Sequence, residues 1–320
     1  MRAKNLAKYI YSYSGMERCM LWLLRNSRIP LFVPIVYHRV CLSMDSYEYM
    51  SVPVDIFDSH IKFIKDNFEV VTMTDGLNLL CEERRKGIYV SINLDDGYMD
   101  NYEHAFPIIK KYGLSATVFL TTDFIGQKHL FWWDEVFQIM RYFGQKHPSI
   151  KSGDILRNAY RADRINAFLM NKKESEIKDF LDKLRNQPRI NENITSIQML
   201  GWREIKEMAE SGLNFGLHTK THRNLCFMEN SEIRKELIGS KLELEKNTGI
   251  KQAGFCYPFG IYDNRVRNLV KDAGFDYART CIKGSNCKNT DRFELRSIDA
   301  SFLLNKTLFT SSVSFYSLRH

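Results

Sequence analysis

Residues 89–97 read Tyr-Val-Ser-Ile-Asn-Leu-Asp-Asp-Gly, a largely apolar run that ends in two carboxylates and a glycine. A short apolar run bounded by a turn residue is typical of a buried strand. Outward from this stretch, from about residue 31 onward, similar runs alternate with helical segments. This alternation is the pattern of βα units around a parallel sheet, so the sequence predicts the α/β class.

Eight runs of this kind predict strands. Their ranges are 31–37, 69–73, 89–95, 116–121, 214–217, 254–257, 276–280 and 294–298. Between several of them, a capping residue opens a helical pattern and a glycine closes it. The helices predicted in this way cover 100–113, 202–211, 231–247 and 264–273.

Residues 127–200 interrupt the alternation with a polar, charge-rich stretch of helical periodicity. We interpret this stretch as a helical insertion, acting as a lid or substrate platform, between a first α/β part (31–126) and a second (201–300). Trp132 and Trp133 near its start are candidate sugar-stacking rings. The alternative, equally weighted, is that these aromatic side chains only anchor the insertion to the core.

The two chain ends lie outside the alternating pattern. Residues 1–30 mix basic and apolar side chains without the unbroken apolar stretch of a signal peptide, so we expect an N-terminal helical segment. It could lie on an anionic membrane surface or, more simply, pack across the end of the fold. Residues 301–320 are expected to form a C-terminal tail. No run approaches the roughly 20 apolar residues of a transmembrane helix.

Composition limits which cellular compartment and which binding partners are expected. The seven cysteines form no Cys-x-x-Cys pair, and their odd number cannot be fully paired within the chain, which favours a reducing, cytoplasmic location. The net charge of +8 favours acidic partners such as anionic glycans or lipid phosphates. Because the basic residues are scattered, a nucleic-acid partner is not expected. The sequence does not indicate an oligomeric state.

Four polar clusters each fall at the end of a predicted strand. They are Tyr37-His38, Asp95-Asp96-Gly97, His218-Thr219-Lys220-Thr221-His222 and Tyr257-Pro258-Phe259-Gly260. The carboxyl ends of parallel strands share one rim of a sheet or barrel, where active sites form. We therefore expect these clusters to meet.

The residue types in two of these clusters suit a metal site. His218 and His222 are four residues apart, so two imidazoles can reach one ion from a single turn or tight loop. Asp95 and Asp96 can both face one pocket if Gly97 turns the chain, with one carboxylate held by a cation and the other free to accept a proton. Two histidines and one carboxylate form a common open zinc site, and cobalt or nickel fits the same ligands.

Taken together, these motifs resemble a known family. The runs 93–98, 218–222 and 257–260, in this order, resemble the first three motifs of the polysaccharide deacetylases, the NodB-homology or family 4 carbohydrate esterases. Three ordered motifs are more specific than any one of them. The resemblance spans about residues 31–300 and implies a distorted (β/α)7 barrel, here with a helical insertion, that removes N- or O-acetyl groups from glycans.

The resemblance also implies roles for individual residues. Asp95 corresponds to the general base, and the divalent metal, expected to be zinc, would be held by Asp96, His218 and His222. Tyr257, Pro258 and Phe259 would line the substrate pocket, with the backbone N–H of Phe259 helping to stabilise the developing oxyanion.

This chain departs from the family pattern in two places, one that concerns the general base and one that concerns the general acid. Many members have an arginine in the third motif where this chain has Cys256, which puts the orientation of the base in doubt. The Leu-x-His motif that supplies the general acid in most members is absent, and the only nearby histidine is His320. A branch that acts on exopolysaccharide has an early Tyr-His, like Tyr37-His38, so we predict that His38 is the general acid. The alternative is a structural histidine that ties strand to loop.

The sequence therefore predicts a metal-dependent N-deacetylase acting on an N-acetylated glycan or lipid-linked oligosaccharide. Two alternatives stay open: an O-acetyl carbohydrate esterase, because the same attack cleaves an ester, and a catalytically weak glycan-binding homologue.

Overall fold

The structure is a computed structural model that describes residues 22, 30–82, 86–146, 155–186, 190, 194–251, 254–304 and 309–313. The helical segment predicted for residues 1–30 lies almost entirely outside the described residues, as do parts of the tail predicted for 301–320, including His320.

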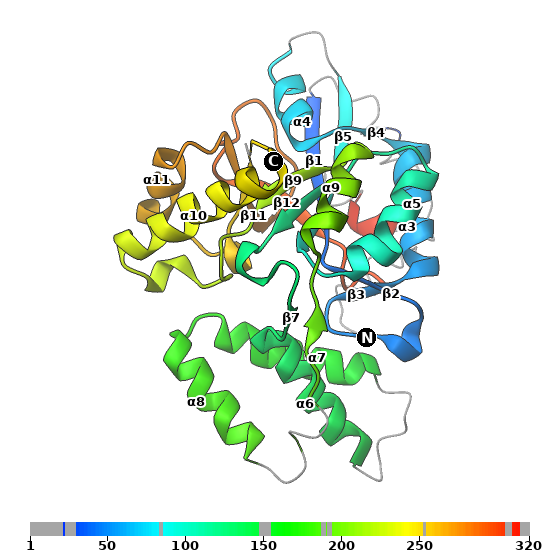
Figure 1. The fold of residues 1–320 in the computed structure, drawn as a ribbon. Coiled ribbons are helices and arrows are strands. Elements are labelled where there is room, and N and C mark those ends of the chain that lie inside the picture. Colours follow the sequence, from blue (N-terminus) through cyan, green and yellow to red (C-terminus); the bar gives the residue numbers. More distant parts are fainter. Residues whose placement is uncertain are drawn as a thin grey trace.

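Seven parallel strands form a closed barrel (Figure 1). They are β1 (Pro30–Tyr37), β5 (Gly87–Asp96), β6 (Thr117–Leu120), β9 (Asn214–Leu217), β10 (Gly254–Cys256), β11 (Tyr277–Lys283) and β12 (Leu295–Asp299). The order around the barrel is β1-β12-β11-β10-β9-β6-β5, and the pairing of β5 with β1 closes it. The predicted (β/α)7 barrel is confirmed, and each predicted strand range overlaps a strand. The shortest of these, β4 (Glu69–Val70), pairs with the first half of β5.

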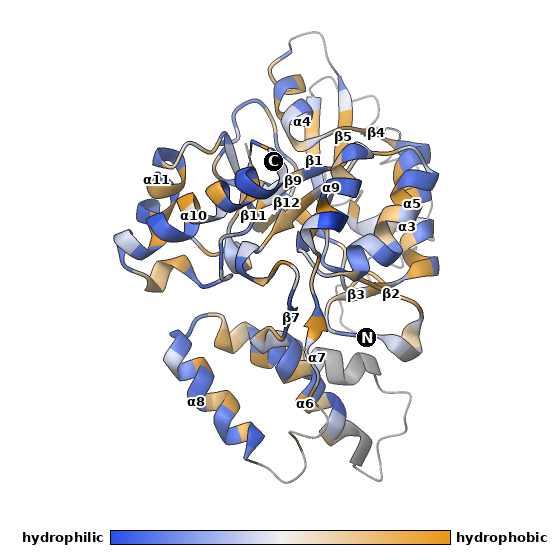
Figure 2. Ribbon diagram, viewed as in Figure 1, coloured by the Kyte–Doolittle hydropathy of each residue, from blue (hydrophilic) through white to orange (hydrophobic). Residues whose placement is uncertain are grey.

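The barrel strands are apolar because they are covered on both sides. All ten residues of β5 are buried, including Ile92 and Leu94. Inward side chains of such a strand fill the barrel and outward ones pack under the surrounding helices. Figure 2 shows the result: the strands are mainly hydrophobic, and the surrounding helices carry hydrophilic residues as well.

Helices of the βα units surround the barrel. They are α3 (Val54–Asn67), α4 (Met73–Leu79), α5 (Phe106–Lys111), α9 (Trp202–Glu210), α10 (Asn230–Thr248) and α11 (Asn264–Asp272). A π-helical turn, Asn101–Ala105, precedes α5. Short 3-10 turns cover 44–46, 122–124, 225–227 and 258–260, and two short strands, β2 (Arg39–Cys41) and β3 (Ser51–Pro53), pair beside the rim. Among the described residues, no helix is both long and apolar enough to cross a membrane.

The described residues of the segment 127–200 form a helical layer below the barrel in Figure 1. Its helices are α6 (Trp132–Lys146), α7 (Ile155–Leu169) and α8 (Glu174–Arg185), and its two ends are joined by the antiparallel pair β7 (Lys128–His129) and β8 (Ile197–Gln198). Tyr98, two residues after β5, bridges to Met199. The insertion therefore lies at the end of the barrel where the strands carry the polar clusters.

Candidate active site

The polar clusters meet at one rim of the barrel, as the sequence predicts. Asp95 and Asp96 end β5, His218 directly follows β9, and His222 lies in the loop after it. All four side chains are at least nine-tenths buried. Residues more than 120 positions apart in the chain are thus brought into one protected site.

Backbone conformation helps to bring these side chains together. Asp96, Thr219, His222 and Phe259 have positive φ angles of 74°, 68°, 58° and 59°. Among the described residues, Met50 is the only other non-glycine residue with positive φ. A left-handed conformation is unfavourable for such residues and persists where the surrounding structure imposes it. The turn at Asp96 lets both adjacent carboxylates serve the same site despite the alternation of side chains along a strand.

Asp96, His218 and His222 form a set of three candidate metal ligands. The Nε2 atoms of the two histidines are 3.0 Å apart. Asp96 Oδ1 lies 3.3 Å from His222 Nε2 and 3.6 Å from His218 Nε2. Ligand atoms placed tetrahedrally at the usual zinc distances are about 3.3 Å from one another. The three atoms are therefore spaced as the ligands of one ion would be.

Hydrogen bonds and charges favour the protonation states that a metal ligand needs. The Cys256 carbonyl accepts a hydrogen bond from His218 Nδ1 at 2.7 Å, which leaves the lone pair on Nε2, facing the site. Burial, followed by the charge of His222, lowers the pKa of His218 to about 4, so the ring is neutral near pH 7. Burial raises the pKa of Asp96, but the hydrogen bond and charge of His222 outweigh it and lower that pKa to about 2.

Apart from the imidazole nitrogens of His222 and His218, at 3.3 and 3.6 Å, the buried Asp96 Oδ1 has no hydrogen-bond partner within the described part of the chain. An unsatisfied buried carboxylate oxygen is costly unless a cation or another donor meets it. The residues present therefore fit a divalent cation.

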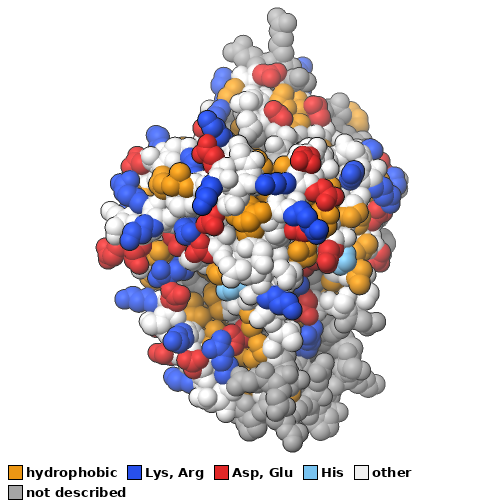
Figure 3. Space-filling view, in the orientation of Figure 1, with side chains coloured by type: hydrophobic (Ala, Val, Ile, Leu, Met, Phe, Trp, Pro, Cys, Tyr) orange, Lys and Arg blue, Asp and Glu red, His pale blue; other side chains and the backbone are white. Residues whose placement is uncertain are grey.

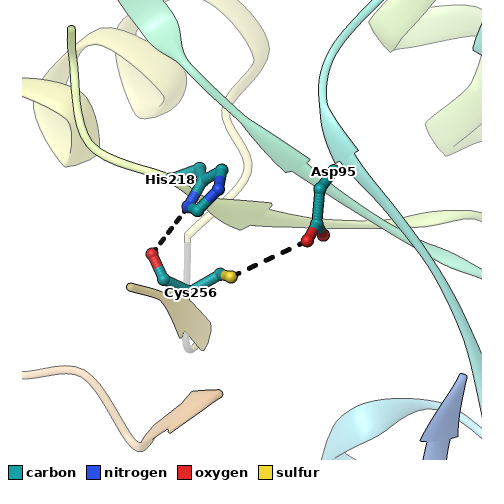
Figure 4. A group of neighbouring side chains, drawn as sticks. All are labelled: Asp95, His218 and Cys256. Atoms are coloured by element: carbon teal, nitrogen blue, oxygen red, sulfur yellow. Dashed lines mark hydrogen bonds between the residues drawn. The ribbon is translucent and has the colours of Figure 1, made fainter. Parts of the chain in front are cut away.

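A second group of potential ligands is Asp95, His218 and Cys256 (Figure 4). Its atoms already have other partners: Cys256 Sγ lies 3.8 Å from Asp95 Oδ2, and His218 donates to the Cys256 carbonyl. Burial raises the pKa of the Cys256 thiol well above its usual range, against the lowering effect of Arg279. Because a metal binds the thiolate, this group is the weaker candidate.

Arg279 on β11 contacts Asp95 and was not found by sequence reasoning. Its Nη2 atom donates to Asp95 Oδ2 and lies 2.9 Å from Cys256 Sγ, and the guanidinium is almost completely buried. Cys256 and Arg279 are paired neighbours on β10 and β11. An arginine from the adjacent strand thus contacts the carboxylate whose orientation the missing third-motif arginine puts in doubt.

His38 lies at the same rim, at the end of β1. Its Nε2 atom is 4.0 Å from Asp95 Oδ2, and its Nδ1 atom is 2.9 Å from Ser301 Oγ. The backbone carbonyl of His38 accepts a hydrogen bond from Asn101 Nδ2 at 2.8 Å, in the π-helical turn. Ser301 thus fixes the ring and Asn101 the backbone of His38, and the second ring nitrogen is directed towards Asp95.

The third motif contributes differently from what its sequence suggests. Tyr257 is fully buried, donates its hydroxyl proton to the Phe293 carbonyl at 3.1 Å and stacks on Tyr262. Pro258 is also buried, so of the three residues expected to line the pocket only Phe259 does so. Its ring lies 4.6 Å from that of His222.

The two candidate stacking tryptophans have different environments. Trp133 is 5% exposed, its ring centroid is 4.5 Å from that of His222, and its indole N–H donates to Tyr98 Oη at 3.1 Å. Trp132 is half-buried and its ring lies 5.6 Å from Phe259. Trp133 therefore packs against His222, a candidate metal ligand, and Trp132 is the more accessible of the two rings.

Glu236 on α10 braces the loop that carries the histidines. Its carboxylate accepts hydrogen bonds from the backbone N–H groups of Lys220 and Thr221 at 2.8 and 2.9 Å, and from the Thr221 hydroxyl at 2.7 Å. A buried carboxylate with three donors is well satisfied. It holds the chain in the turn between His218 and His222.

A groove of about 990 Å³ opens between the rim and the insertion. Trp132, His222 and Phe259 line it together with residues of α8 and of the loop after His222. Of the three candidate metal ligands, His222 lines this groove, so the groove borders the site.

A family model described as polysaccharide deacetylase matches residues 82–278, which is more than half of the chain. The chain belongs to the polysaccharide deacetylase family. Its members are hydrolases that act on carbon–nitrogen bonds other than peptide bonds. The matched range includes Asp95, Asp96, His218 and His222, the residues that meet at the rim.

The chain is similar to two curated proteins that are named as deacetylases. A putative polysaccharide deacetylase of Bacillus subtilis, YxkH, is 29% identical over 274 residues, which cover 85% of this chain and 72% of the relative. A poly-beta-1,6-N-acetyl-D-glucosamine N-deacetylase of Staphylococcus aureus is 25% identical over 241 residues, which cover 71% of this chain. The match spans 60% of the staphylococcal protein.

Among solved structures, the Streptococcus pyogenes deacetylase PplD, in complex with acetate, superimposes with a TM-score of 0.57. It is 18% identical and the match covers 84% of this chain and 92% of that one. This likeness supports the barrel fold.

Proposed function

We propose that this protein is a metal-dependent N-deacetylase that hydrolyses the acetamide of an amino sugar in a glycan. The observation that carries the proposal is the set of three ligand atoms from Asp96, His218 and His222, with the carboxylate of Asp95 beside it and outside it. The name of the staphylococcal relative supports an N-acetylglucosamine unit as the substrate sugar.

The first part of the proposal concerns the metal. Asp96, His218 and His222 would hold one divalent ion, and zinc is the expected metal because two imidazoles and one carboxylate suit it, as they also suit cobalt or nickel. When bound, such an ion polarises the acetyl carbonyl and makes water more acidic.

Asp95 then acts as the general base. Arg279 donates to one oxygen of Asp95, and the other oxygen, Oδ1, lacks a hydrogen-bond partner among the described residues. That free oxygen takes the proton of the attacking water, while the arginine fixes the orientation of the carboxylate.

His38 acts as the general acid. Collapse of the tetrahedral intermediate expels an amine, which must gain a proton. His38 precedes Asp95 in the chain and the two proposed histidine ligands follow it, but all of them lie at the same rim. Ser301 fixes the His38 ring. The backbone N–H of Phe259 is proposed to stabilise the oxyanion.

The insertion is proposed to be the substrate platform. Trp132 offers a half-buried ring at the groove, and Trp133 packs against a metal ligand. A sugar chain lying in the groove would stack on Trp132 and place one acetamido group over the rim.

Acetate release tests the function directly. The zinc-loaded protein is incubated with oligomers of N-acetylglucosamine, both β-1,4- and β-1,6-linked, and acetate is measured enzymatically. We expect release with one of these substrates and none after chelation, with recovery when zinc is restored. Release only from O-acetylated sugars would favour the esterase alternative, and binding without any release would favour the weak glycan-binding homologue.

A further inference from the structure

The groove beside the site extends well beyond the metal ligands. His222 is a lining residue, and from it the groove runs along α8 and to the loop that leads into this helix. Figure 3 shows this face of the molecule, with Lys and Arg side chains around a hollow that exposes apolar side chains. Anything bound along the groove is thus continuous with the site.

The apolar part of the groove suits the faces of sugar rings. Trp132 and Phe259 lie together at one end, and Phe227, which is 46% exposed, lies in the loop after the histidines. Aromatic rings that are partly accessible at a cavity wall stack on the C–H faces of sugars. These rings indicate where a sugar would lie but not what charge it carries.

The charged part of the groove is unbalanced. Of the described lining residues, five are basic and one is acidic; the basic residues are Lys172, Lys173, Lys178, Arg185 and Arg223, and the acidic one is Glu174. The two arginines are neutralised locally: Arg223 pairs with Glu174 at 2.7 Å, and Arg185 pairs with Glu135 at 2.5 Å.

The lysines are less well compensated. Lys172 Nζ lies 3.4 Å from the carboxylate of Glu176. Lys173 and Lys178 are exposed, and neither ammonium group forms an ion pair in the described part of the chain, although Glu176 accepts a hydrogen bond from the Lys173 backbone N–H at 2.9 Å. Two exposed ammonium groups on one wall of a groove attract phosphate or carboxylate groups, because opposite charges complement each other across an interface.

We propose that the groove binds the chain flanking the reactive amino sugar, and that this chain carries phosphate or carboxylate groups that pair with Lys173 and Lys178. The proposal rests on the proposed function, since it names the class of glycan that the same site would process. It makes the substrate an anionic acetamido glycan rather than a neutral homopolymer.

The test uses three probes that share one backbone: chitohexaose, 6-O-phosphorylated chitohexaose and 6-O-carboxymethylated chitohexaose. Dissociation constants are measured by calorimetry with the zinc-loaded Asp95→Asn protein, so that no probe is consumed, at 50 and 300 mM salt. The groove variant is Lys173→Gln/Lys178→Gln. The matched control, Lys206→Gln/Lys235→Gln, removes the same charge from α9 and α10, outside the groove.

We expect at least one anionic probe to bind about tenfold more tightly than chitohexaose at low salt, and the higher salt to reduce this preference. The groove variant should lose about three- to tenfold in affinity for that probe and little for chitohexaose, because each exposed pair contributes modestly. The phosphorylated and carboxymethylated probes distinguish the two anionic groups.

Three results would overturn the proposal: equal binding of neutral and anionic probes, no binding of any probe, or an equal loss in the control variant. Failure of the proposed function gives a different signature. In that case the wild-type protein releases no acetate from any probe, while the preference for the anionic probe remains.

Discussion

Asp95 and Asp96 are adjacent and equally buried, yet their carboxylates have different partners. Asp96 faces two imidazole nitrogens, whereas Asp95 is held by Arg279. This difference in partners is the basis of the proposed roles, in which Asp96 holds a cation and Asp95 accepts a proton.

Substituting the two kinds of residue should separate chemistry from metal binding. Asp95→Asn keeps the shape and the hydrogen bond from Arg279 but removes the base, so we expect about a 10²–10⁴-fold fall in kcat with unchanged zinc content. His222→Ala should lose zinc. Acetate assays and elemental analysis on the same samples measure both, and the opposite pattern would refute the assignment.

Arg279 is expected to matter for stability as well as for positioning. Arg279→Met leaves the buried Asp95 carboxylate without its cation, and losing one partner of a buried pair costs about 3–5 kcal/mol. Chemical denaturation measures this loss. In a double-mutant cycle, adding Asp95→Asn should restore part of the stability; a full, additive loss would show that the pair is not coupled.

His38 is expected to affect turnover more than folding. His38→Gln removes the proposed proton donor, so we expect kcat for acetate release to fall about 10²–10⁴-fold while the melting temperature changes little. Ser301→Ala, which removes only the hydrogen bond to His38 Nδ1, serves as the milder comparison. A large loss of thermal stability in His38→Gln would instead indicate the structural role.

At the scale of elements, the strand ends determine where the chemistry lies. The loop after β9 carries both histidines, and α10 supports it through Glu236. Partners behind the ligands commonly change metal affinity about 10–100-fold. We expect Glu236→Gln to weaken zinc binding by this amount in a competition titration with a chelator.

Glu243→Gln on the same helix provides the matched control. Glu243 pairs with the Lys220 side chain at 3.2 Å. The hydrogen bonds to the loop backbone are made by Glu236. Zinc affinity should stay within about twofold of wild type in this variant. Equal weakening in both variants would mean that charge on α10, rather than the hydrogen bonds to the loop, controls the affinity.

Sequence patterns were sufficient to predict the elements that repeat along the chain. The apolar runs ending in polar clusters predicted the barrel strands and the rim at which Asp95, Asp96, His218 and His222 meet, because alternating βα units have few other arrangements. The helices at 54–67 and 73–79 were not predicted, since they lack the glycine stops that marked the others.

The residues that escaped prediction are those whose role depends on spatial neighbours. Arg279 lies in a strand without any motif and reaches Asp95 only because β10 and β11 are adjacent. Glu236 is 14 or more positions from the histidines that its hydrogen bonds support. The buried orientation of Tyr257 likewise follows from packing against Phe293 and Tyr262, which a motif cannot reveal.

At the scale of the whole molecule, His60 links α3 to the C-terminal segment. It is fully buried, and its ring stacks on Phe309 at 3.7 Å. Burial lowers the pKa of His60 to about 3, against the raising effect of the Leu303 backbone carbonyl as a hydrogen-bond acceptor. The folded state therefore keeps this ring neutral over a range in which the unfolded chain would protonate it.

Stability should consequently depend on pH. The unfolded state binds more protons than the folded state between about pH 6.5 and pH 3, so the free energy of unfolding falls as the pH is lowered through this window. We expect His60→Gln to be less stable at pH 7 but to show a shallower fall in denaturation curves recorded between pH 7 and pH 4. An unchanged slope would contradict this origin.

The central claim is that Asp96, His218 and His222 bind one divalent ion while Asp95 stays outside its coordination sphere. Anomalous X-ray diffraction at the zinc edge, on crystals of the zinc-loaded protein, tests it most directly. We expect a single strong peak among Asp96 Oδ1 and the two Nε2 atoms, with Asp95 still bonded to Arg279. A peak between Asp95 and Cys256, or no peak at the rim, would contradict the account.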